Sequence, residues 1–127
     1  MNLKDYFETT HGTGILATAD GEGRVDAAVY ARPHVMEDGT IAMIMLDRLS
    51  HHNLKSNPHA AYLFMESGAG YRGVRLFLTK VREEEGGELL ETLRRRMSPV
   101  ERSIDSGRKF LVFFQVDEEL PLVGTGT

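Results

Sequence analysis

Apolar positions along the chain fall into short runs separated by turn-forming residues, a pattern typical of small β proteins. Extended segments are predicted at residues 15–19, 25–36, 41–46, 60–65, 74–82 and 110–116. Turn signals at 20–23 and 38–39, where Gly follows Asp, separate the first three of these segments. Pro33 cannot donate a ladder hydrogen bond, so it marks an edge, a bulge or a break in the second segment. The pattern predicts six strands with hairpin-type connections.

Three short helices are predicted at residues 2–10, 51–56 and 87–97. Ser50 precedes the second helix and is expected to be its N-cap, because a serine hydroxyl accepts a hydrogen bond from an unpaired backbone N–H. The third helix is expected to have acidic residues at its start, at 83–85 and 88, and basic residues 94–96 at its end, which suits the helix dipole. One apolar side of this helix would carry Leu89, Leu90, Leu93 and Met97. Residues 1–127 therefore predict a single, mostly β domain, a six-stranded antiparallel barrel.

Three of the predicted strands are apolar without interruption, at residues 41–46, 60–65 and 110–114. A strand of an antiparallel sheet with one wet face should alternate, so these strands are expected to be covered on both faces. Three short helices offer too little surface to cover them all. A second copy of the chain would cover the rest, so the pattern predicts a homodimer.

Composition narrows the possible functions. The 127 residues carry a net charge of −4 with a pI near 5.7, which argues against binding to nucleic acid. The absence of cysteine excludes disulfides, thiolate nucleophiles and zinc–thiolate sites. The apolar runs are too short to span a bilayer, and charges near the N-terminus replace the apolar stretch of a signal peptide. The expected location is the cytoplasm, with no membrane partner.

Several motifs have simpler explanations than a catalytic or metal site. Residues 68–73 match G-x-G-x-x-G, but a strand follows instead of a helix, so an inter-strand loop is expected in place of a dinucleotide site. Tyr71 and Arg72 in that loop could face a substrate. The histidines lack the spacing of a metal site, and no nucleophile stands at a strand-to-helix elbow. No metal is expected and no residue is assigned a catalytic step.

The segment 47–53 has different chemistry. It places Arg48 and Ser50 at the start of the second helix, directly after a strand. Helix N-termini bind phosphate through unpaired N–H groups and the helix dipole, and these two side chains would add directed donors. The alternative is that Ser50 only caps the helix and Arg48 is only solvated.

The chain resembles the FMN-binding split-barrel family, the small relatives of pyridoxamine 5′-phosphate oxidase. The resemblance is most specific in three stretches, at residues 14–18, 30–35 and 50–58. The resemblance runs from about Gly14 to Val116. It implies a six-stranded antiparallel split barrel that binds FMN at the interface of a homodimer. The residues it implies for FMN binding are Arg32, Pro33 and His34 beside the flavin or its ribityl chain, Ser50 with Arg48 at the phosphate, and the helical Asn53.

The implied function is a flavin-dependent oxidoreductase with a small-molecule substrate or electron donor. Many relatives have Lys or Arg where this chain has Leu49 and Ser50, and the Arg-rich C-terminal segment of the true oxidase is missing. Oxidation of pyridoxamine phosphate is therefore not expected. The alternatives are a non-enzymatic FMN carrier or electron-transfer protein, a barrel that binds haem or F420, and a barrel that has lost its cofactor.

Overall fold

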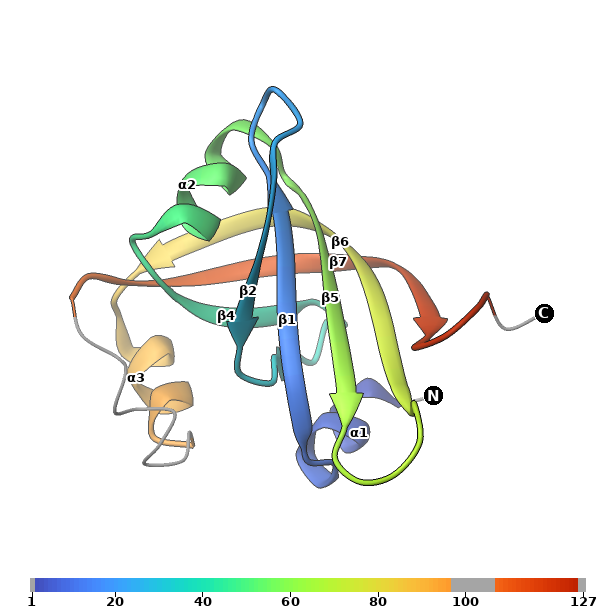
Figure 1. Ribbon diagram of the computed structural model, residues 1–127. Helices are drawn as coiled ribbons and strands as arrows, with labels where there is room; N and C mark the ends of the chain where they lie inside the picture. Colours follow the sequence, from blue (N-terminus) through green and yellow to red (C-terminus); the bar gives the residue numbers. More distant parts are fainter. Residues whose placement is uncertain (1, 97–106, 126–127) are drawn as a thin grey trace.

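The computed structural model describes residues 2–96 and 107–125 (Figure 1). Its elements are α1 (Leu3–Thr9), β1 (Gly12–Ala19), β2 (Val25–Tyr30), β3 (His34–Val35), β4 (Ile41–Leu46), α2 (Leu49–Ser56), β5 (His59–Glu66), β6 (Gly73–Glu85), α3 (Glu88–Arg94) and β7 (Lys109–Pro121). The strands form one antiparallel sheet in the order β2-β1-β5-β6-β7-β4-β3. The mostly β, antiparallel prediction is confirmed.

The sheet curls around one apolar core, to which β1 and β4–β7 all contribute buried side chains. The fully buried aromatic residues at its centre are Tyr62, Phe64 and Phe114. The helix α1 closes one end by inserting Phe7, whose ring meets those of Tyr62 and Phe64 edge-on. The helix α2 lies at the other end of β1, against β1, β2 and β4 (Figure 1). Because each interior-facing position is filled by a side chain, a large ligand has to bind outside the barrel.

The structure has seven strands where the sequence predicts six. The extended segment 25–36 divides into β2 and β3 around residues 31–33. Pro33 lies in this gap, and its missing N–H is the physical reason that the ladder stops there. The predicted Asp38–Gly39 turn follows, with Gly39 at a φ of +90°. The other strands stand where they were predicted, and several extend further than expected.

The helix α3 covers more of the sheet than its length suggests. Leu90 and Leu93 pack on the outer face of β4 and β7 in a second apolar cluster with Ala42, Leu111 and Phe113. These two strands are thus covered on both faces within one chain. Leu89, expected on the same side, is 38% exposed, and Met97 lies outside the described residues. Residues 83–85 belong to β6, so the helix does not start among them.

The outer face of β2, β1, β5 and β6 has no such cover. On this face Val29 of β2 is opposite Ile15 of β1, and Ile15 is opposite Leu63 of β5. Ala61 of β5 is likewise opposite Phe77 of β6. Val29 is 75% exposed and Phe77 41%. We call this surface the outer apolar face; its most exposed members are Val25, Val29, Met65 and Phe77. The prediction that β5 is covered on both faces does not hold within a single chain.

In the described part of the chain, no helix has the length and apolar character that a bilayer crossing requires.

Candidate functional site

The first turn of α2 follows β4 directly and differs from the prediction at its cap. The N-cap residue is Arg48, which has an extended backbone, and no side chain bonds to the first turn. The prediction that Ser50 caps the helix is wrong. Ser50 stands inside the first turn and is 4% exposed. Its hydroxyl points to the barrel, where it contacts the phenol of Tyr30 at the end of β2. The first turn therefore keeps unpaired N–H groups for an external anion.

Arg48 and Tyr30 form the polar surroundings of this turn. Arg48 is exposed and has no ion-pair partner within residues 2–96 and 107–125. Burial raises the pKa of Tyr30, while the Ser50 hydroxyl and the Arg48 charge act in the opposite direction. Tyr30 thus keeps its proton at neutral pH and can donate a hydrogen bond. Arg48 and the uncapped turn lie side by side as the sequence predicts, and their role in binding a phosphate stays a prediction.

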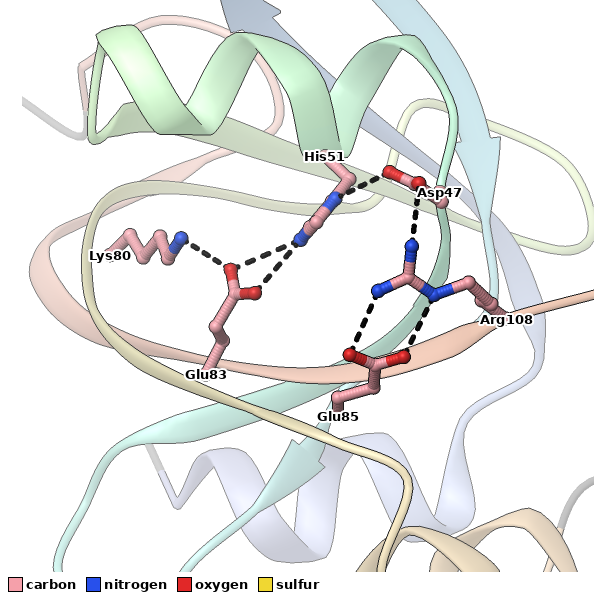
Figure 2. A network of polar contacts seen from close by, with 6 residues as sticks. All are labelled: Asp47, His51, Lys80, Glu83, Glu85 and Arg108. Carbon is pink, nitrogen blue, oxygen red and sulfur yellow. Dashed lines mark hydrogen bonds and ion pairs between the residues drawn. The ribbon is translucent and has the colours of Figure 1, made fainter.

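The rest of α2 is fixed to the barrel by polar contacts. The side-chain amide of Asn53, 3% exposed, donates to the Thr18 hydroxyl of β1 at 3.1 Å. His51, 1% exposed, has Nδ1 3.1 Å from Asp47 and Nε2 3.0 Å from Glu83 of β6 (Figure 2). The amide of Asn53 therefore fixes α2 to β1. Its predicted role beside FMN stays a prediction.

His51 is the centre of the network in Figure 2. Its ring stacks on Phe110 with 4.0 Å between centroids. Its two ring nitrogens thus each face a carboxylate, Asp47 on one side and Glu83 on the other. The hydrogen bond from His51 lowers the pKa of Asp47. Burial alone would raise the pKa of Glu83, but hydrogen bonds from Lys80 and His51 lower it below its ordinary value.

Arg108 extends the network at the start of β7. Its Nε and Nη2 each bond to one oxygen of Glu85 at 2.8 Å, and its Nη1 lies 3.7 Å from Asp47 (Figure 2). The bond from Arg108 lowers the pKa of Glu85. Together these contacts join the start of α2 to β6 and β7. They hold the anion-binding turn in place on the sheet.

Arg32, Pro33 and His34 lie at the bend between β2 and β3. They line a cavity of about 400 Å³ whose other walls are α1 and α3. The Nη1 atom of Arg32 donates to the backbone carbonyls of Phe7 at 3.0 Å and Thr10 at 3.1 Å, at the C-terminal end of α1. Pro33 is buried and His34 half-buried. Sequence reasoning missed Lys4 and Arg96, which also line this cavity.

The structure therefore brings the predicted cofactor residues together in two groups. Arg48 and Ser50 stand at α2, while Arg32, Pro33 and His34 stand at the bend. A second, small cavity of about 20 Å³ lies on the side of the bend, with Tyr30, Arg32 and His34 in its wall. Tyr30 is the residue that touches both groups. Its place at the start of the segment 30–35 was the available signal in the sequence.

Tyr71 and Arg72 lie apart from both groups. They belong to the loop between β5 and β6, and neither lines one of the two cavities. Tyr71 is 79% exposed. The strand β6 starts at Gly73, so the glycine-rich segment is an inter-strand loop as predicted. A substrate-facing role for these two residues stays a prediction.

In residues 2–96 and 107–125, no group of three or more His, Asp or Glu side chains is arranged to hold a metal ion. Arg94, the last residue of α3, lies 3.7 Å from Glu91 one turn earlier, and Arg96, just after the helix, lines the large cavity.

The sequence matches no protein-family model and no curated protein. Solved structures share its fold. An FMN-binding protein from Syntrophomonas wolfei aligns with a TM-score of 0.76 and 19% identity, over 96% of this chain and 84% of that chain. The heme storage protein HutZ from Vibrio cholerae aligns with a TM-score of 0.71 and 16% identity, over 94% and 91%. An F420 reductase aligns with a TM-score of 0.64 and 15% identity, over 94% and 96%.

Pyridoxamine 5′-phosphate oxidase-like proteins from Lactobacillus delbrueckii and Listeria innocua also align, with TM-scores of 0.69 and 0.59. At identities of 13–19%, these likenesses establish the fold and leave the ligand open. The chain has the fold of the FMN-binding split-barrel family, as its sequence predicts.

Proposed function

We propose that the protein binds FMN and acts as a flavin-dependent oxidoreductase. The observation that carries the proposal is the first turn of α2, which no side chain caps and which exposes Arg48 on a barrel shared with an FMN-binding protein. The FMN phosphate would bind to the N–H groups of this turn and to Arg48. The flavin would extend past Tyr30 toward the bend at Arg32 and His34.

The residues present fit this cofactor. A phosphate needs N–H donors and a positive charge, which the turn and Arg48 offer, and Tyr30 adds a neutral donor nearby. Bound FMN supplies the hydride or electron transfer, and the protein orients the cofactor and limits access of water. No side chain of this chain is assigned a chemical step.

Removing the Arg48 charge tests the phosphate site. Arg48→Ala is expected to weaken FMN binding by about tenfold or more, because a charge-assisted hydrogen bond is lost. Riboflavin lacks the phosphate, so its weaker binding should not change. Quenching of flavin fluorescence on titration with protein measures both affinities.

Arg24→Ala is the matched control, because Arg24 is an exposed arginine at the far end of β2. It should bind FMN as the unchanged protein does. Unaltered FMN affinity in Arg48→Ala would place the phosphate elsewhere. An equal loss for FMN and riboflavin would mean that Arg48 supports the fold and not the phosphate.

We further propose that the protein is a homodimer joined through the outer apolar face. Contiguous exposed apolar surface on a sheet is typical of an interface, and this face spans four strands. The second copy would also cover β5, the one continuously apolar strand that the chain leaves open. The flavin would then lie in a cleft between the two copies.

Val29→Asp tests the dimer. The unchanged protein is expected to have the mass of two 14.2 kDa chains by light scattering after gel filtration, and the variant the mass of one. A buried, unpaired carboxylate within an apolar interface opposes association. Val123→Asp, 66% exposed and beyond the sheet, is the control and should stay dimeric. A monomeric unchanged protein, or a dimeric Val29→Asp variant, would contradict the interface.

The absorbance spectrum of the protein before and after addition of FMN separates the cofactor alternatives. A flavin spectrum that survives desalting at about one FMN per chain supports the proposal. A Soret band would indicate haem, and a protein that retains no flavin would favour F420 or no cofactor. Turnover with NADH or NADPH would distinguish an enzyme from a carrier, which should not turn over.

A further inference from the structure

The cavity between α1, α3 and the β2–β3 bend contains an unusual excess of positive charge. Lys4, Arg32 and Arg96 line it, against the two carboxylates of Glu8 and Glu37. The chain as a whole has a net charge of −4, so the charge of the cavity lining is opposite in sign to that of the protein. None of the three cations has an ion-pair partner in the part of the chain that the structure describes.

Arg32 is held in a fixed orientation inside this cavity. Both described hydrogen bonds of its guanidinium come from Nη1, and both go to carbonyls at the end of α1. Within the described residues, Nε and Nη2 have no partner. These two nitrogens form one edge of the guanidinium. Through this edge an arginine donates two parallel hydrogen bonds to a carboxylate or a phosphate.

The same molecule shows what this edge binds. Arg108 uses Nε and Nη2 to hold Glu85, with both bonds at 2.8 Å (Figure 2). Arg32 lines the cavity, and its Nε and Nη2 are the nitrogens left for a ligand there once Nη1 has bonded to α1. The neighbouring walls are apolar, with Phe7, Val35 and Leu93 among them. At about 400 Å³ the cavity falls within the range of small-molecule sites.

We propose that this cavity is a binding site for a small anionic molecule, which places a carboxylate or phosphate on the Nε–Nη2 edge of Arg32 and an apolar body against α1 and α3. Lys4 and Arg96 add charge at its opening. The site is distinct from the first turn of α2, and the proposal does not depend on FMN binding. If FMN binding is also correct, the small cavity at Tyr30 places this molecule near the flavin, as a substrate would be.

The experiment is a titration of the flavin-free, ¹⁵N-labelled protein followed by NMR. Benzoate is the probe and benzamide, its neutral counterpart of equal shape, is the control. Benzoate should shift the amides of Ala31, Arg32 and His34 and those around Lys4 and Arg96, and should bind at least about tenfold more tightly than benzamide. Inorganic phosphate distinguishes the two anion types: tighter binding than benzoate at the same amides would identify a phosphate ligand.

Arg32→Lys is the decisive variant. A lysine keeps the charge and can donate to the carbonyls of α1. It cannot donate two parallel hydrogen bonds to one carboxylate, so benzoate should bind at least about tenfold more weakly. If this variant fails to fold, Arg96→Gln offers a second test at an exposed position, with an expected loss of about threefold. Arg24→Gln is the matched control and should leave benzoate affinity unchanged.

Three results would overturn the proposal. The first is equal binding of benzoate and benzamide. The second is unchanged benzoate affinity in a folded Arg32→Lys variant, or in Arg96→Gln if Arg32→Lys does not fold. The third is a set of shifts confined to residues 48–51, which would assign the anion to α2 alone. In that third case the proposed FMN phosphate site would survive while the cavity site would not, so the two proposals fail separately.

Discussion

Replacing His51 with alanine is expected to lower the free energy of unfolding by about 3 kcal/mol, because a buried aromatic ring and the hydrogen bonds of both its nitrogens are lost together. The ring is 1% exposed and stacks on Phe110, so its removal leaves a cavity. Asp47 and Glu83 each lose a donor, although both keep some contact with water and other cations. Urea unfolding followed by circular dichroism measures the difference.

The effect of His51→Ala should depend on pH in a defined direction. The pKa values of Asp47 and Glu83 are lowered in the folded protein, with His51 among the causes of both. Carboxylates with lowered pKa stabilise the fold above their ordinary pKa, and this stabilisation is lost as the pH falls through the folded value. The difference between the two proteins should therefore be largest above about pH 5 and shrink below about pH 4.

His52→Ala is the matched control, since His52 is the exposed neighbour of His51 on the same helix. It should change the free energy of unfolding by less than about 0.5 kcal/mol at any of these pH values. An effect of His51→Ala that is equally small, or one that grows toward acidic pH, would contradict the described network.

Replacing Gly14 with alanine is expected to destabilise the protein by about 3 kcal/mol through steric overlap. A Cβ at this position would lie 1.9 Å from the Tyr62 hydroxyl oxygen and 2.8 Å from the backbone oxygen of Tyr30. Tyr62 cannot turn away at low cost, because it is fully buried and its hydroxyl donates to the Ala31 carbonyl. The backbone oxygen can move only if β1 and β2 separate.

Gly21→Ala provides the comparison within the same hairpin. Its Cβ would approach no atom closer than 3.5 Å, which is ordinary contact with Ser56, and the change should cost less than about 1 kcal/mol. Thermal unfolding of the two variants measures the contrast. Equal midpoints would show that Tyr62 does not occupy the space beside Gly14. A shift of Tyr62 would also move Ala31, next to Arg32, so Gly14→Ala should weaken benzoate binding as well.

Much of the fold could be predicted because local patterns decide it. The apolar runs located the strands, and Pro33 marked the place where the second run divides into β2 and β3. The cover of β4 and β7 could not be predicted in the same way. Two leucines of α3, Leu90 and Leu93, cover both strands, which depends on how the sheet curls under them. Periodicity identifies an apolar face but not the surface that it meets.

The site shows the same limit. The sequence indicated an anion-binding turn at residues 48–50, and the structure places an uncapped turn there. It indicated Ser50 as the N-cap of α2, but the helix begins two residues earlier with Arg48 in that position. The cavity beside Arg32 could not be predicted at all. It combines Lys4, Arg32 and Arg96, which lie far apart in the sequence and meet only after the barrel has closed.

The position of β7 determines when this protein can fold during synthesis. β7 is the seventh strand along the chain, yet it pairs with β6 on one side and with β4 on the other. Phe110, Val112 and Phe114 enter the main core, and Leu111 and Phe113 enter the cluster under α3. A nascent chain that has not yet released β7 from the ribosome therefore has two unpaired strand edges and two incomplete cores. The barrel is expected to close only after translation of this strand, and until then the exposed edges are targets for chaperones.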